Sequence, residues 1–275
     1  MERHCARTTT GSGPRVVLVH GFTQTHRSWA PVTRRLATDY EVVGVDAPGH
    51  GASPPAGSSF AAGAALIGAA GGEAVYVGYS MGGRYCLRLA LDDPGRVRAL
   101  VVLGASPGIP NAQQRAERRA RDSALAATLE AGGGHTSDHE ILRSFLDRWL
   151  ASPLFATLPV EAAGKDDRIA HNSSRRLAES LRNAGAGAME PMWDDLHRLA
   201  MPVLVVCGED DTAYGDVCIR AARSIGTNAR LAFVPGAGHA AHLEQPDAFT
   251  AILRSFLAEI ASRASAHGEL ARPDP

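Results

Sequence analysis

The pentapeptide Gly78-Tyr79-Ser80-Met81-Gly82 constrains the fold of this chain more than any other stretch. It follows the apolar run 74–77, whose residues favour a strand, and it precedes the segment 83–90, which has a helical pattern. A strand-to-helix turn this tight leaves no room for side chains at positions 78 and 82, so glycine is required at both. The turn lifts Ser80 clear of the sheet at a helix N-terminus, where backbone amides favour a developing anion. The sequence therefore predicts a nucleophile elbow with Ser80 as the candidate catalytic serine.

Short apolar runs alternate with helical segments in the first and last thirds of the chain. Expected strands cover residues 15–19, 40–45, 74–77, 99–104, 202–208 and 230–234, and expected helices cover 28–36, 61–70, 83–90 and 247–262. Apolar strands that alternate with helices indicate parallel strands joined by right-handed crossovers. The sequence therefore predicts an α/β class protein with a mostly parallel central sheet and helices on both of its faces.

The alternation stops between residues 106 and 199, where no convincing strand occurs. Polar segments with helical spacing cover residues 113–130, 138–150 and 173–183. We therefore expect residues 106–199 to form a helical lid, inserted between two strands over the carboxyl ends at which ligands bind. Residues 14–105 and 200–262 would then form the core. Residues 1–13 would be a loose terminus or an edge element, and residues 263–275 would be a loose terminus.

The composition of the 275 residues excludes several classes of function. A formal net charge of −1 gives no reason to expect nucleic acid or an anionic membrane as a partner. No apolar run approaches the ~18 residues that a membrane span needs, and the start of the chain lacks the apolar region of a signal peptide. The four cysteines are scattered and form no disulfide framework. These features predict a soluble cytoplasmic protein. The sequence does not indicate its oligomeric state.

A serine hydroxyl becomes a base or a nucleophile when an imidazole takes its proton and a carboxylate orients that imidazole. The chain order for an elbow of this type is serine, acid, histidine. His239 ends the glycine-rich loop 235–239, after the last expected strand, and is the expected imidazole. Asp210 and Asp211 both follow the strand 202–208. Asp211 is the preferred acid because families of this type carry G-x-x-D there, and Asp210 is the alternative.

The oxyanion hole of such a site needs two backbone amides. One is expected from Met81, directly after the serine, and the other from Phe22 in the first loop. His135 and His139 have a spacing found in metal sites, but the adjacent glycines at 132–134 favour a loop, so no metal site is predicted. The sequence also lacks a glycine motif for nucleotide binding, so no cofactor is expected.

With these motifs in place, the chain resembles the α/β-hydrolase superfamily from about residue 15 to residue 261. A narrower resemblance is to the 2-succinyl-6-hydroxy-2,4-cyclohexadiene-1-carboxylate (SHCHC) synthases of menaquinone biosynthesis. The matching core segments are His-Gly-Phe-Thr (20–23), Asp-Ala-Pro-Gly-His-Gly-Ala-Ser (46–53), the elbow (78–84), Ala-Ser-Pro-Gly-Ile (105–109) and the histidine loop (236–246). The matching lid segments are Trp-Leu-Ala-Ser-Pro-Leu-Phe (149–155) and Leu-Ala-Glu-Ser-Leu-Arg (177–182). The lid matches carry the most weight, since lids vary widely across the superfamily.

The resemblance implies a lyase that eliminates pyruvate from a succinylated, carboxylated cyclohexene. In that family the serine and histidine remove a proton and no acyl-enzyme forms. The substrate carries three carboxylates, and arginine is the side chain best suited to bind them. Arg84 lies one helical turn after Ser80 and can face the cavity. The further substrate-binding residues that the resemblance implies are Arg118, Arg168, Trp149 and Tyr79.

Two other functions are compatible with the sequence. A serine esterase or C–C bond hydrolase would use the same serine, acid and histidine on an uncharged acyl substrate. A non-catalytic ligand-binding protein of this fold is a further hypothesis, against which the intact set of reactive residues argues.

The glycine-rich stretch 185–188 departs from the resembled family and predicts a loosely held part of the lid.

Overall fold

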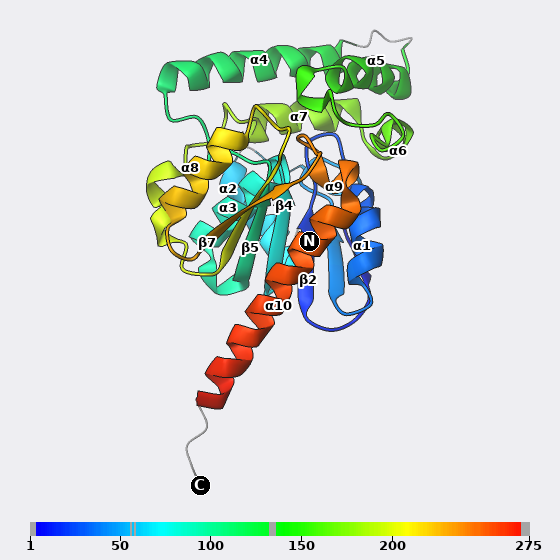
Figure 1. Ribbon diagram of the computed structural model, residues 1–275. Helices are drawn as coiled ribbons and strands as arrows, with labels where there is room; N and C mark the ends of the chain where they lie inside the picture. Colours follow the sequence, from blue (N-terminus) through cyan, green and yellow to red (C-terminus); the bar gives the residue numbers. More distant parts are fainter. Residues whose placement is uncertain (1–3, 56, 58, 132–135, 271–275) are drawn as a thin grey trace.

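The computed structural model describes residues 4–55, 57, 59–131 and 136–270. Its centre is a seven-stranded sheet with the order β1-β3-β2-β4-β5-β6-β7 (Figure 1). The strands are β1 (Arg7–Thr10), β2 (Arg15–Val19), β3 (Glu41–Val45), β4 (Ala74–Tyr79), β5 (Val97–Leu103), β6 (Val203–Gly208) and β7 (Ala229–Val234). β1 pairs antiparallel with β3, and the other neighbouring pairs are parallel. The predicted α/β class and mostly parallel sheet are confirmed.

Helices cover both faces of the sheet. Successive residues of β2 point to opposite faces, so Val17 and Val19 join one buried cluster whereas Val16 and Leu18 join another. Burial on both faces explains why the inner strands β2, β4, β5 and β6 are continuously apolar, whereas the edge strands β1 and β7 are largely exposed. The helices over the first cluster are α2 (Phe60–Gly71), α3 (Met81–Asp92) and α8 (Gly215–Ile225), and those over the second are α1 (Ala30–Leu36), α9 (Ala241–Glu244) and α10 (Pro246–Leu270). Short 3-10 helices lie at His26–Trp29, Pro94–Arg96, Pro153–Phe155 and Trp193–Arg198.

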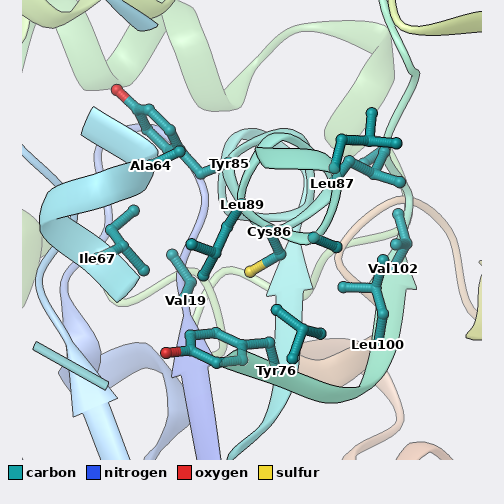
Figure 2. Close-up of a cluster of buried hydrophobic side chains, with 14 of the residues drawn as sticks. Val19, Ala64, Ile67, Tyr76, Tyr85, Cys86, Leu87, Leu89, Leu100 and Val102 are labelled. Carbon is teal, nitrogen blue, oxygen red and sulfur yellow. The ribbon is translucent and has the colours of Figure 1, made fainter. Parts of the chain in front are cut away.

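Figure 2 shows part of the first cluster, where α2 and α3 pack on the sheet. Ile67 of α2, Leu89 of α3 and Tyr76 of β4 are buried together there. The Tyr76 hydroxyl satisfies its hydrogen-bonding need by donating to the Gly72 carbonyl oxygen at 2.6 Å. This packing fixes α3 against the sheet, and with it the turn that carries Ser80.

Four helices between β5 and β6 form a layer that we name the cap. They are α4 (Ala112–Glu130), α5 (Asp138–Leu150), α6 (Lys165–His171) and α7 (Ser174–Ala184). Figure 1 shows them gathered at one end of the sheet. They share an apolar cluster that includes Leu129, Phe145 and Leu177. The cap therefore has its own buried contacts in addition to those it makes with the sheet domain.

The stretch 185–188 after α7 is closely packed, in contrast to the loose segment that the sequence predicts. A Cβ atom at Gly185 would lie 2.4 Å from Asp122 Oδ2, and one at Gly187 would lie 2.3 Å from the backbone nitrogen of Arg119. Glycine is required at these positions because the chain passes directly against α4.

Parts of both termini form regular elements. The first segment contains a strand at the edge of the sheet, which is the second of its two predicted alternatives, and the prediction of a loose end is wrong for the part of 263–275 that continues α10. β1 occupies Arg7–Thr10, and its polar, exposed threonines gave no apolar signal. α10 continues to Leu270 instead of ending at residue 262, and residues 271–275 lie outside the described part. Within the described residues, no helix combines the length and the apolar character needed to cross a membrane.

Candidate active site

Four loops meet at the carboxyl ends of parallel strands. The predicted site residues that they carry are Phe22 (after β2), Ser80 (after β4), Asp211 (after β6) and His239 (after β7). The carboxyl ends of parallel strands lie at one edge of a sheet, which is where ligands bind in open α/β sheets. Residues of the cap and of these loops line a common cavity at this edge.

The turn at Ser80 has the strained geometry of a nucleophile elbow. Ser80 has φ 51° and ψ −109°, a backbone conformation that non-glycine residues rarely adopt. A Cβ atom at position 78 would lie 2.5 Å from Gly82 O, and one at position 82 would lie 2.2 Å from Val19 O. The steric reason for glycine at both positions is therefore confirmed.

The structure brings Ser80, His239 and Asp211 together. His239 Nε2 lies 3.1 Å from Ser80 Oγ, and His239 Nδ1 lies 2.8 Å from Asp211 Oδ2. The side chains of His239 and Asp211 are 1% and 2% exposed, so water is excluded from their contact. An ionised carboxylate can only accept a hydrogen bond, so Nδ1 carries the proton and Nε2 is left to accept from the serine hydroxyl.

Asp210, the alternative acid, lies elsewhere. Its side chain is exposed and makes no hydrogen bond to His239. Its backbone nitrogen donates to the Ala237 carbonyl oxygen at 2.8 Å. Asp210 thus ties the acid loop to the histidine loop through the main chain, while Asp211 supplies the carboxylate.

The two amides predicted to form an oxyanion hole have no protein acceptor in the described part of the chain. Met81 is the first residue of α3, where a backbone N–H has no partner within the helix. The Phe22 amide belongs to the turn in which Gln24 N donates to Gly21 O, and it donates to no protein atom described there. Both residues line the cavity beside Ser80. The two donors are therefore available to an oxygen atom bound next to the serine.

Two buried histidines brace the loops around the site. Ala47 N donates to His20 Nε2 at 2.9 Å, and Thr23 N donates to His50 Nε2 at 3.3 Å. Burial lowers the pKa of His20 to about 4 and that of His50 to about 3, so both rings are neutral near pH 7. Neutral rings can accept these bonds, which fix the loop that carries Phe22.

The cavity beside Ser80 has an empty volume of about 750 Å³, including its opening to solvent. The predicted site residues in its wall are Phe22, Tyr79, Ser80, Met81, Arg84, Arg118, Trp149 and Arg168. The lining residues that the sequence did not single out are Gln24, Ala105, Ser106, Leu154, Phe155, Ser180, Leu181, Ala184, Gly185, Ala186 and Tyr214. The Tyr214 ring packs 4.5 Å from the His239 ring. Position in the chain is the sequence signal that could have pointed to two of these lining residues. Gln24 follows Phe22 by two residues, and Tyr214 follows Asp211 by three.

Two of the lining arginines have no carboxylate partner among the described residues. Arg84 is half-buried, and its Nη1 donates to Ala184 O at 2.7 Å. Arg168 is 4% exposed, and it donates from Nε to Ala163 O at 2.8 Å and from Nη1 to Thr23 Oγ1 at 2.7 Å. Burial lowers the pKa of both guanidinium groups, that of Arg168 to about 10. Arginine side chains carry their positive charge in proteins near pH 7. Desolvated cations with only neutral partners favour an anionic ligand.

Arg118 differs from the other two because it has a partner on its own helix. Its Nε donates to Asp122 Oδ1 at 2.8 Å, one helical turn away. Asp122 is 3% exposed, and its second oxygen has no hydrogen-bond partner in the described structure. Arg118 lines the cavity with part of its positive charge offset by this carboxylate.

Aromatic rings form another part of the cavity wall. The Trp149 ring lies 5.4 Å from the Phe22 ring and 5.8 Å from the Phe155 ring. Tyr79 is buried with its ring 5.3 Å from that of His239, and burial raises its pKa. These rings give the cavity an apolar surface in addition to its arginines.

The described residues contain no group of three or more His, Cys, Asp or Glu side chains placed to hold a metal ion. Of the two histidines with metal-like spacing, His135 lies outside the described residues. His139 is an exposed residue in the first turn of α5.

The chain is similar to known proteins in sequence and in structure. Residues 16–252 match the model of the alpha/beta hydrolase family. The chain is 31% identical over 258 residues to a putative SHCHC synthase of Bacillus subtilis, covering 89% of this chain and 90% of that protein. It is 32% identical over 254 residues to the SHCHC synthase of Serratia proteamaculans, covering 89% and 93%. MenH from S. aureus has a similar structure, with a TM-score of 0.83, 26% identity and coverage of 94% of this chain and 99% of that one.

Proposed function

The chain belongs to the alpha/beta hydrolase family, and we propose that it is a lyase of menaquinone biosynthesis that eliminates pyruvate from a succinylated cyclohexene carboxylate. The relatives named SHCHC synthase, which align over most of both chains, support this reaction. The match to MenH along nearly the whole chain supports it as well. The alternative enzyme class within the family is a hydrolase.

The observation that carries the proposal is the charge of the cavity beside Ser80. Arg84 and Arg168 line it without a carboxylate partner among the described residues, and Arg118 adds a third guanidinium group. An uncharged ester would leave these desolvated cations uncompensated. A substrate with several carboxylates would form charge-assisted, forked hydrogen bonds with them.

The chemistry follows from the hydrogen bonds at Ser80. Asp211 holds His239 with Nε2 facing the hydroxyl, so the imidazole takes the serine proton and Ser80 removes a proton from the ring of the substrate. As that C–H bond breaks, the electron pair forms a ring double bond, and the C–O bond breaks to release the enolate of pyruvate. The enolate takes the proton of the His239 imidazolium to give pyruvate, and Ser80 keeps the proton from the substrate, so both residues return to their starting state. The amides of Phe22 and Met81 stabilise the negative oxygen that develops. The arginines hold the carboxylates in place during these steps.

The proposal is tested with a coupled assay for pyruvate release from the menaquinone intermediate. We expect release by the parent chain, a loss of roughly a thousandfold or more in Ser80→Ala, and a large loss in Arg84→Ala. Ser123→Ala, on the exposed side of α4, is the matched control and should keep the parent rate. Pyruvate release by Ser80→Ala at a near-normal rate would refute the role of this serine.

A serine esterase or C–C bond hydrolase is the second candidate, because the same Ser80–His239 hydrogen bond also activates a nucleophile. Turnover of neutral 4-nitrophenyl esters, without pyruvate release from the menaquinone intermediate, would favour this alternative. Labelling of Ser80 by a fluorophosphonate would argue against a non-catalytic ligand-binding role.

We also propose that this chain binds a small anionic molecule as its partner and that it is located in the cytoplasm. Cys5, Cys86, Cys207 and Cys218 are buried free thiols, which are typical of proteins in a reducing compartment. Fractionation of cells that express the tagged chain tests the location directly.

A further inference from the structure

Gln24 contributes a buried amide to the wall of the cavity beside Ser80. It lies in the loop after β2, two residues beyond Phe22, and it is 2% exposed. Its Oε1 accepts from Gly21 N at 3.0 Å and from Ser28 Oγ at 3.4 Å. A backbone N–H can only donate, so the oxygen must face Gly21, and the orientation of the amide group is fixed by the network.

This orientation leaves the NH2 group of Gln24 as the unused part of the side chain. Within the described structure, Nε2 donates to no protein acceptor. Nε2 is not one of the fully buried polar atoms that lack a partner among the described residues, so it keeps some exposure to solvent. A ligand that displaces this water must supply an acceptor, because a donor buried without one is unfavourable. A donor held in one direction at the wall of a reactive cavity therefore points to an acceptor on the ligand.

Arg168 lies at the same wall and has a similar unused group. Gln24 and Arg168 both line the cavity beside Ser80, and both also line the neighbouring groove next to β1 and β3. Arg168 Nη1 donates to the hydroxyl of Thr23, the residue that precedes Gln24. Its Nε is used by Ala163, so Nη2 is left without a protein acceptor in the described part. The wall thus presents two N–H donors, of which one carries a positive charge.

We propose that Gln24 Nε2 and Arg168 Nη2 together bind one carboxylate of the substrate, which makes Gln24 a substrate-binding and specificity-determining residue. This inference rests on the proposed anionic substrate. A carboxylate has two oxygens with four lone pairs, so it can accept from both donors at once. An ester of similar shape lacks the charge, and it would leave the Arg168 guanidinium uncompensated.

The test measures binding separately from turnover. The dissociation constant of the succinylated cyclohexene carboxylate is measured by calorimetry on Ser80→Ala and on Ser80→Ala combined with Gln24→Glu. Glutamate keeps an oxygen for Gly21 N–H, but it replaces the donor with a negative charge beside Arg168. We expect the dissociation constant to rise at least tenfold. Gln114→Glu, which adds the same charge at an exposed position of α4, should change it less than twofold.

Gln24→Met is the second variant, because methionine keeps the length of the side chain and removes the donor without adding charge. Its dissociation constant should rise at least threefold, and thermal unfolding verifies that each variant is folded. An unchanged constant in a folded Gln24→Glu or Gln24→Met protein would overturn the inference and leave the proposed function intact. If the dissociation constant depends on Gln24 but the parent chain releases no pyruvate, the proposed function is refuted and the inference about Gln24 stands. Failure of Ser80→Ala to bind the compound would overturn both.

Discussion

The Nε2 atom of His239 lies 3.1 Å from the Oγ atom of Ser80, although 159 positions separate the two residues in the chain. β4 carries the serine and β7 carries the histidine loop, at opposite sides of β5 and β6 in the sheet. The contact exists because all four strands are parallel and end at the same edge. The chemistry of Ser80 therefore depends on correct assembly of the sheet on both sides of the cap insertion.

The hydrogen bond between His239 and Asp211 predicts a large effect of Asp211→Asn. An amide in place of the carboxylate can donate to Nδ1, which would turn the imidazole into the wrong tautomer and leave Nε2 protonated toward Ser80. We expect kcat to fall by about 10³ to 10⁴. The control is Asp210→Asn, an exposed neighbour whose side chain does not contact His239, and it should keep at least half of the parent kcat. Equal losses in both variants, measured by pyruvate release, would contradict the assignment of Asp211.

The position of Arg84 predicts that lysine cannot replace it. Lysine keeps the charge, but it loses the planar fork that binds a carboxylate through two hydrogen bonds. The expected fall in kcat/KM for the anionic substrate is roughly tenfold to hundredfold. Arg88→Lys, one turn further along α3 and paired there with Asp92, is the matched control and should behave as the parent. Steady-state kinetics of the two variants decide the question, and a loss confined to Arg88→Lys would reject the role of Arg84.

Most of the sheet domain could be predicted from the sequence because its signals are local. The apolar runs and the glycines of the elbow depend on a few neighbouring residues, and the order Ser80, Asp211, His239 needs only the topology. Two elements without a predicted strand or helix lack such signals: β1 is polar and exposed on the sheet edge, and α6 has only seven residues, with Arg168 buried on it. α8 was missed although its buried residues Cys218, Ala221 and Ile225 have helical spacing.

The cavity wall was predicted less completely, since its composition depends on contacts between distant segments. Gln24 has no distinguishing pattern in the sequence, and its role follows only from the bond that Oε1 makes to Gly21. Tyr214 is identified only by the packing of its ring on His239. The glycines at 185 and 187 looked flexible, because the sequence does not show that α4 passes against them.

The contact between Gly187 and α4 predicts that Gly187→Ala destabilises the protein. The added Cβ would lie 2.3 Å from the Arg119 backbone nitrogen, so the chain must move away from α4. Overpacking of this kind costs about 1–3 kcal/mol. Gly95→Ala, where a Cβ would meet nothing within 4 Å, is the control. Urea unfolding should show a lower midpoint for Gly187→Ala alone, and equal midpoints would show that the cap accommodates the methyl group.

Because the His242 ring is buried without hydrogen-bond partners among the described residues, we predict that this residue makes the stability of the protein depend on pH. Its ring is fully buried against Trp29 and Tyr79, at centroid distances of 4.3 and 4.4 Å, and neither ring nitrogen has a partner among the described residues. Burial, reinforced by the charge of Arg168, holds its pKa well below the ordinary 6.5. Below pH 6.5 the unfolded chain takes up a proton that the folded chain does not. The free energy of unfolding therefore decreases as the pH falls through this range.

Replacement of this histidine by phenylalanine removes the titrating group and keeps an aromatic ring among aromatic neighbours. Between pH 7 and pH 5, His242 can account for at most about 2 kcal/mol of the loss in stability, the limit reached when the folded ring stays neutral and the unfolded pKa is 6.5. His242→Phe should therefore lose less stability than the parent over this interval, although His20 and His50 still contribute to both proteins. A packing penalty from the larger ring would be the same at both pH values, so it cancels in the comparison. Urea unfolding at pH 7 and pH 5 measures the difference, and equal losses in the two proteins would show that folding does not lower the pKa of His242.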